Sequence, residues 1–143
     1  MGSMSASELL RLPVRLHGIR LGRPVDLLLA AAAWRAVGFL VRCGDGSERF
    51  LAFAAAEARS GEIAVPSALL LLEYVEFYRR RTRSLRSLLG TAVASGTHEL
   101  GELRDVRLAP DGSVVSLVVA TGDGLSELPP GSARTPTSPL AAG

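Results

Sequence analysis

The stretch Leu21-Gly22-Arg23-Pro24-Val25-Asp26-Leu27 decides the fold, because the same pattern returns as Leu100-Gly101-Glu102-Leu103-Arg104-Asp105-Val106. Leu, Gly and Asp occupy matching places in both stretches. Further matches follow in the same order: Val14 with Val93, residues 35–41 with residues 113–119, and Gly44-Asp45-Gly46 with Gly122-Asp123-Gly124. Four ordered matches indicate that one module occurs twice in the chain.

The residues inside the repeat predict β-strands. Residues 37–41 and 114–119 are short apolar runs bounded by turn residues, and Asp111-Gly112 between two such runs is a signal for a hairpin of type I′. The alanines at 30–33 hold the hairpin position in the first copy. Alanine favours helix over residues 27–34, but the repeat favours a strand there. Residues 49–54 and 62–65 add two further strands to the first copy.

The repeated pattern of a turn, Leu-Gly, three residues, Asp, an apolar strand, a hairpin and a second apolar strand resembles the PRC-barrel family. The resemblance covers residues 12–65 and 88–128, and residues 50–53 look like the family's next strand, with Ala52 where proline is usual. It implies a mainly β fold, with a small PRC-type barrel and a partial second module, joined by one α-helix. It also implies a non-catalytic assembly role, since PRC-barrels typically serve as assembly domains.

Five segments follow from these patterns. Residues 1–11 are an N-terminal extension whose first three residues resemble a cloning remnant, residues 12–66 the first module, and residues 67–89 a connector. Residues 90–128 form the shortened second module, and residues 129–143 a disordered tail rich in Ser, Thr and Pro. A shortened module leaves a sheet edge that needs cover. The cover comes from the same chain or from a second copy, so a homodimer is one expected arrangement.

The connector is expected to be a single arginine-rich helix that begins near Ser67 and ends at Gly90. Arg79, Arg83 and Arg86 would then share one face. Two interpretations stay open for that face. It is either a solvated helix surface or a partner-binding site for RNA phosphates or acidic lipid headgroups. The net charge of +2 and the few aromatics favour the first interpretation.

The histidines, the repeat positions and the glycine-rich turns do not predict a catalytic or metal site. No cluster of cysteines or carboxylates accompanies His17 or His98 at metal-ligand spacing, so no metal is expected. Gly22, Asp26, Gly101 and Asp105 are structural repeat positions. For the two aspartates, a shared structural need is a better explanation than paired-carboxylate catalysis. Phosphate-loop and nucleophile-elbow motifs are absent from the sequence, so neither a cofactor nor enzymatic activity is expected.

Composition sets the remaining expectations. The chain has 143 residues and is 48% hydrophobic, enough to fold, and its most apolar uninterrupted run, residues 27–34, is far shorter than the roughly 20 residues of a membrane-spanning helix. A single cysteine, Cys43, and no secretory signal pattern predict a cytoplasmic protein. The expected function is protein interaction or assembly. The alternatives are a ribosome- or RNA-associated assembly factor and a peripheral membrane adaptor, both using the arginine face.

Overall fold

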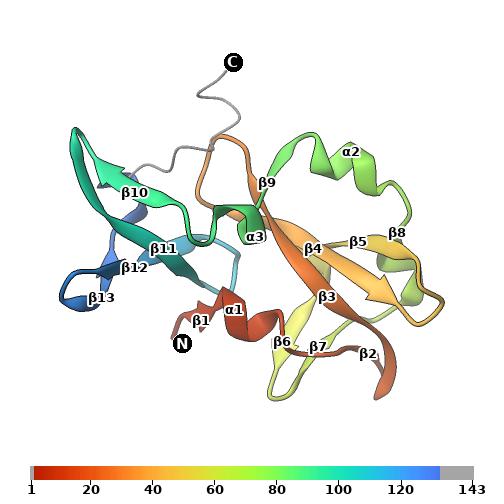
Figure 1. The fold of residues 1–143 in the computed structure, drawn as a ribbon. Helices are drawn as coiled ribbons and strands as arrows, with labels where there is room; N and C mark the ends of the chain where they lie inside the picture. Colours follow the sequence, from red (N-terminus) through yellow and green to blue (C-terminus); the bar gives the residue numbers. More distant parts are fainter. Residues whose placement is uncertain (1, 133–143) are drawn as a thin grey trace.

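The computed structural model describes residues 2–132 of the chain. The fold is mainly β, with two sheets and only short helices. Four antiparallel strands of one sheet curl into a half-barrel (Figure 1). No helix of the described residues is long and apolar enough to cross a membrane. The expected disordered tail falls mostly on residues 133–143, which lie outside the described part.

The larger sheet has the order β6-β7-β2-β3-β4-β5-β8, with β9 paired to β3. Its strands are β2 (Val14–Leu16), β3 (Ile19–Ala30), β4 (Ala36–Cys43), β5 (Glu48–Ala52), β6 (Glu57–Arg59), β7 (Glu62–Ala64), β8 (Leu71–Leu72) and β9 (Thr82–Ser84). Strands β2 to β5 form an antiparallel meander, which we call the first unit. Strand β7 joins β2 in parallel, and β8 joins β5 antiparallel.

The smaller sheet has the order β1-β11-β12-β13, with β10 paired to β11. Its strands are β1 (Met4–Ser5), β10 (Ala92–Ser95), β11 (His98–Leu108), β12 (Val114–Thr121) and β13 (Gly124–Leu128). Strands β10 to β13 repeat the meander of β2 to β5 and form the second unit. Among the described residues this unit has no counterpart of β6, β7 or β8.

The two units match down to their irregularities. The pairing of β2 with β3 shifts register between Val14 and Arg15, and the pairing of β10 with β11 shifts between Val93 and Ala94. In the long hairpins, β3–β4 shifts between Pro24 and Asp26, and β11–β12 shifts between Leu103 and Asp105. Each position in the second unit lies 79 residues after its counterpart. Because a β-bulge fixes where a strand bends and twists, shared bulges give both hairpins the same shape.

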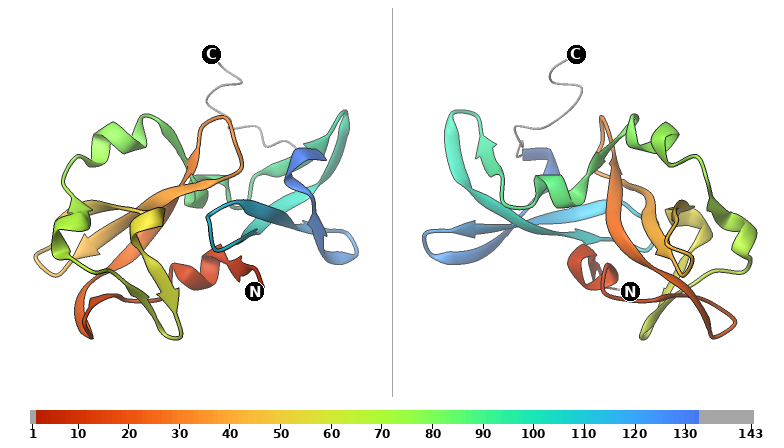
Figure 2. Two further views of the ribbon diagram at one scale, coloured as in Figure 1. Left: turned by 180° about the vertical axis from the view of Figure 1, so that it is seen from behind. Right: turned by 45° about the vertical axis from the view of Figure 1, so that its right-hand side comes forward.

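Each unit is preceded in the sequence by a short arm that packs on the other unit. The N-terminal arm, residues 4–10, contains β1 and α1 (Ala6–Leu9), and its strand pairs with β11 of the second unit. The connector arm, residues 83–89, contains the end of β9 and α3 (Leu85–Leu88), and its strand pairs with β3 of the first unit. The arms thus precede one unit in sequence and cover the other in space (Figure 2). The expected extension at residues 1–11 is therefore largely part of the fold.

The tips of the two long hairpins also meet. Arg35 and Ser113 form an isolated antiparallel bridge. The Ala36 N–H donates to the Gly112 carbonyl over 2.8 Å, and the Val114 N–H donates to the Trp34 carbonyl over 3.0 Å. Arg35 and Ser113 occupy the same position in the aligned repeat. A pairing of equivalent positions places the two units about an approximate two-fold axis, as the subunits of a symmetric dimer lie.

One hydrophobic core joins both units. Twenty-two buried residues form it, among them Leu27 and Phe39 of the first unit, Val106 and Leu117 of the second, and Leu88 of the connector arm. A smaller cluster of Leu28, Leu40 and Phe50 lies on the other face of the larger sheet. Helix α2 (Val75–Arg79) covers this cluster, and its Tyr78 ring stacks on Phe50 with 3.7 Å between the ring centroids.

The expected helix over residues 67–89 is wrong. The segment contains a 3₁₀ turn at Ala68–Leu70, strand β8, helix α2, strand β9 and helix α3. Leu71 and Leu72 are extended because they pair with Leu51 and Phe50, and residues 82–84 are extended because they pair with β3. Pairing with sheet edges outweighs the helical propensity of leucine and arginine in this segment.

The local predictions in the repeat have mixed outcomes. The strand prediction for residues 27–34 is confirmed as far as Ala30, where β3 ends. A hairpin at Asp111-Gly112 is confirmed, but the type I′ turn is wrong. The Ala109 N–H donates to the Ser113 carbonyl across a three-residue loop, and of the loop residues only Gly112 has positive φ, at 93°. That geometry is the common three-residue hairpin loop with glycine at its left-handed position.

Candidate functional site

Asp26 is the acceptor at which the connector arm closes onto the first unit. Its Oδ1 accepts the N–H of Leu27 at 2.8 Å and that of Arg86 at 3.1 Å, and its Oδ2 accepts the hydroxyl of Ser84. Ser84 in turn caps α3, because its Oγ accepts the Ser87 N–H at 3.2 Å. One half-buried carboxylate therefore fixes the arm through both its backbone and its capping side chain.

Asp105 repeats this arrangement with the N-terminal arm. Its Oδ1 accepts the N–H of Val106 at 2.8 Å and that of Ser7 at 3.0 Å, and its Oδ2 accepts the hydroxyl of Ser5. Ser5 caps α1 through the Glu8 N–H at 3.2 Å. The two aspartates predicted as structural repeat positions thus hold the two arms by equivalent bonds. All the oxygens concerned are engaged by backbone and hydroxyl groups of the fold.

Sequence reasoning missed the serines of these two sites. Ser5 and Ser84 are separated by the same 79 positions as the aspartates, and Leu9-Leu10 and Leu88-Leu89 follow them at equal distances. This match would have extended the repeat by an arm at each start. Interpreting residues 1–11 as an extension and residues 67–89 as one helix hides this match.

Gly22 and Gly101, the other predicted repeat positions, allow a close approach of backbones. A Cβ added at Gly22 would lie 2.3 Å from the Arg42 carbonyl oxygen, and one at Gly101 would lie 2.0 Å from the Ala120 carbonyl oxygen. Both distances are shorter than any side chain tolerates. The glycines therefore serve the pairing of each long hairpin near its open end.

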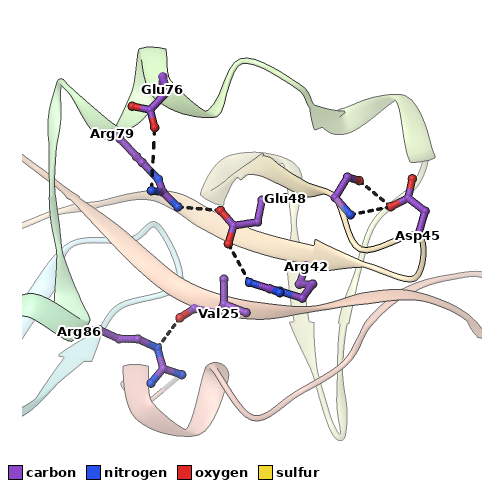
Figure 3. A network of polar contacts seen from close by, with 8 residues as sticks. Val25, Arg42, Asp45, Glu48, Glu76, Arg79 and Arg86 are labelled. Atoms are coloured by element: carbon purple, nitrogen blue, oxygen red, sulfur yellow. Dashed lines mark hydrogen bonds and ion pairs between the residues drawn. The ribbon is translucent and has the colours of Figure 1, made fainter.

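The three predicted partner-binding arginines lie on different elements. Arg79 is on α2, Arg83 on β9 and Arg86 on α3. The Arg79 Nη2 lies 2.6 Å from Glu48 Oε1, and its Nη1 lies 3.9 Å from Glu76, while Glu48 also pairs with Arg42 at 3.1 Å (Figure 3). The Arg86 Nε donates to the Val25 carbonyl (Figure 3).

Arg83 is buried, with 7% of its surface exposed. Its Nε donates to the Ala30 carbonyl at 3.1 Å, its Nη2 donates to the Ala33 carbonyl at 3.3 Å, and its guanidinium lies 4.5 Å from the centre of the Trp34 ring. Burial lowers the pKa of this guanidinium. Arg83 therefore ties the connector arm to the hairpin tip of the first unit, away from any surface shared with Arg79 and Arg86.

The open edge of β13 is the clearest unfilled position in the fold. Strand β13 pairs with β12 on one side, and no strand of the described residues pairs with its other side. Its residues 124–127 are all exposed, and Leu125 is 70% exposed. Strand β5, its counterpart in the first unit, is covered by β8 and has two buried residues, Phe50 and Leu51.

An apolar pocket of about 450 Å³ lies where the N-terminal arm meets both units. Its walls include Met4, Leu9, Phe39, Phe53, Ile63 and Pro110. Among the described residues that line it, the one charged group is Glu57, which is paired with Arg59 at 2.6 Å. The pocket offers apolar contact but few polar groups to orient a ligand.

Titratable groups elsewhere are dispersed. Within residues 2–132 no three His, Cys, Asp or Glu side chains are grouped to hold a metal ion. His17 and His98 are exposed at the turns that open β3 and β11. Burial raises the pKa of the Cys43 thiol, which keeps it in its less reactive, protonated form.

Comparison of the sequence with protein-family models and with curated proteins finds no match. A functional conclusion therefore depends on the geometry of the two units and their edges.

Proposed function

We propose that the chain is a non-catalytic protein-interaction or assembly module whose units are of the PRC-barrel type. The observation that carries the proposal is the open edge of β13. The same edge is covered by β8 in the first unit but by no strand of the described residues in the second. An uncovered edge presents a row of backbone donors and acceptors to which another chain can pair.

The use of polar groups inside the fold supports a binding role over a catalytic one. Asp26 and Asp105 accept N–H and hydroxyl groups that hold the arms, and neither has a histidine among its hydrogen-bond partners. A serine hydroxyl bonded directly to a carboxylate is positioned as a structural donor, whereas a nucleophile needs a base that can take its proton.

The two alternatives, RNA or ribosome association and adhesion to an acidic membrane surface, receive less support. Both require Arg79, Arg83 and Arg86 to act from one face. Arg83 is buried against Trp34, and Arg79 is paired with Glu48. Of the three, only Arg86 is exposed without an ion pair to a carboxylate of the described residues, and one such charge is a weak basis for binding an anionic surface.

Affinity capture from the native cell tests the proposal, with the full chain as bait and an unrelated β-protein of matched charge as control. We expect one or a few proteins that bind again when each is purified and mixed with the chain. The proposal fails if no captured protein binds in the purified mixture. Co-sedimentation with ribosomes or flotation with acidic liposomes, in the absence of such a protein, would support the alternatives instead.

A further inference from the structure

The covered edge of β5 supplies a template for what the open edge of β13 accepts. In the first unit Asp26 stands opposite Leu40, and Leu40 stands opposite Phe50. In the second unit Asp105 stands opposite Val118, and Val118 stands opposite Glu127. Glu127 is therefore the counterpart of Phe50, and Leu128 is the counterpart of Leu51. In the template these two positions pair with Leu72 and Leu71 of β8.

The backbone groups at the open edge follow from the register. A two-residue turn, Gly122-Asp123, joins β12 to β13, so Thr121 and Gly124 begin the ladder as a hydrogen-bonded pair. Because the ladder alternates, the N–H and C=O groups of Leu125 and Glu127 face away from β12. Phe50 presents its backbone to β8 in the same way, which agrees with the alignment of the two units.

The side chains at the edge differ between the units and set the chemistry of the occupant. Phe50 belongs to an apolar cluster, whereas Glu127 is exposed and accepts the Ser116 hydroxyl at 2.7 Å. Leu128 is half-buried and packs against the shared core, as Leu51 does. Opposite Leu128 an apolar side chain is favoured, because Leu51 in the first unit pairs with Leu71. Opposite the Glu127 carboxylate a basic side chain is favoured, because opposite charges across two strands attract.

We propose that β13 accepts an extended segment of a partner protein as an antiparallel strand, with an apolar residue opposite Leu128 and a basic residue opposite Glu127. An apolar or aromatic residue two positions further on would cover Leu125. This inference rests on the proposed interaction function and specifies the partner's chemistry. The source of the segment is a different protein, since β13 (Gly124–Leu128) contains no basic residue that a second copy of this strand could place opposite Glu127.

A peptide designed on the template tests the inference. The probe copies residues 67–74 with Leu72→Arg, so that Arg meets Glu127 and Tyr74 meets Leu125 when Leu71 meets Leu128. Its control carries Leu72→Asp and brings like charges together. The full chain, labelled with ¹⁵N, is titrated with each peptide by NMR. We expect saturable binding of the Arg peptide, roughly tenfold weaker binding of the Asp peptide, and slower hydrogen exchange at Leu125 and Glu127.

Two protein variants separate backbone pairing from side-chain attraction. Glu127→Pro removes an outward N–H without removing a donor to β12, and it should abolish binding. Glu127→Arg keeps the N–H and should reverse the preference, so that the Asp peptide binds about tenfold more tightly than the Arg peptide. Glu127→Arg also provides the test if Glu127→Pro does not fold.

Several outcomes would overturn the inference. These are no saturable binding at millimolar peptide, equal binding of both peptides, an unchanged preference in Glu127→Arg, or chemical-shift changes confined to β5 or β10. Self-association of the chain that Glu127→Pro abolishes would identify a second copy as the occupant instead. A partner captured from cells that still binds Glu127→Pro would leave the interaction function standing and remove β13 as its site.

Discussion

Ser84 donates its hydroxyl hydrogen to the Asp26 carboxylate across 58 positions of the chain, and this bond joins the arm of the second unit to the first unit. The equivalent bond from Ser5 to Asp105 joins the arm of the first unit to the second. Each unit thus lends a segment to the other, as the subunits of a domain-swapped dimer do. Neither unit completes its own arm site, so the two depend on each other within one chain.

Replacing either aspartate should destabilise the whole chain. Asp26→Ala leaves the Arg86 N–H and the Ser84 hydroxyl without their acceptor, and we expect a loss of about 2–4 kcal/mol in the free energy of unfolding. Asp105→Ala should cost a similar amount, because Ser7 and Ser5 lose the equivalent bonds. Urea unfolding followed by circular dichroism measures both.

Asp123→Ala is the matched control, since this aspartate lies exposed in the β12–β13 turn and should change stability by less than about 0.5 kcal/mol. A double-mutant cycle of Asp26→Ala with Ser84→Ala should give a coupling energy of about 1–2 kcal/mol. A coupling near zero would show that the bond to Ser84 does not hold the arm.

The glycines of the repeat give a second prediction. Gly22→Ala places a methyl group where the Arg42 carbonyl oxygen lies 2.3 Å away, so the β3–β4 hairpin must open near its end. We expect a destabilisation of about 1–3 kcal/mol. Gly44→Ala is the control, because its Cβ meets nothing within 4 Å. Thermal unfolding of the two variants compares them, and equal melting temperatures would refute the close-approach explanation.

Much of the β architecture was predictable from the sequence, because a repeated local pattern records the strands, turns and bulges that both copies need. The Leu-Gly-x-x-x-Asp pattern located both long hairpins and the aspartates that later proved to hold the arms. The connector was not predictable in the same way. Leu71 and Leu72 become a strand only because β5 offers them an edge, and nothing within residues 67–89 records that edge.

The Ser–Asp bonds show a second limit of sequence reasoning. Ser5 and Asp105 are 100 positions apart, so neither carries a local sign of the other. Arg83 illustrates the same point. A helical wheel places it beside Arg79 and Arg86, whereas the structure buries it against Trp34 at the tip of the β3–β4 hairpin. Contacts between distant segments decided which polar side chains became structural.

Because the two units share one hydrophobic core, we expect the whole chain to unfold in a single cooperative transition. Trp34 is the single tryptophan and lies at the hairpin tip of the first unit, whereas Leu117 is fully buried in the second unit. Leu117→Ala should cost about 2–5 kcal/mol. The fluorescence transition of Trp34 should shift to lower urea together with the circular dichroism transition.

Val115→Ala, at a 46% exposed neighbour on the same strand, is the control and should leave both transitions nearly unchanged. Separate transitions would mean that the units fold independently.

Arg83 should be worth more to the fold than the exposed arginines. Arg83→Ala removes two hydrogen bonds to the β3–β4 hairpin tip and the contact with the Trp34 ring, so we expect a loss of about 2–4 kcal/mol. Arg83→Lys keeps the charge but not the planar fork, and its cost should lie between those of Arg83→Ala and wild type.

Arg79→Ala is the matched control. Its ion pairs with Glu48 and Glu76 are exposed to solvent, and their loss should cost less than about 1 kcal/mol. Urea unfolding measures the three variants, and the Trp34 emission of the folded Arg83 variants should change as well. If Arg79→Ala and Arg83→Ala proved equally mild, the contacts of Arg83 with the hairpin tip would have no stabilising role.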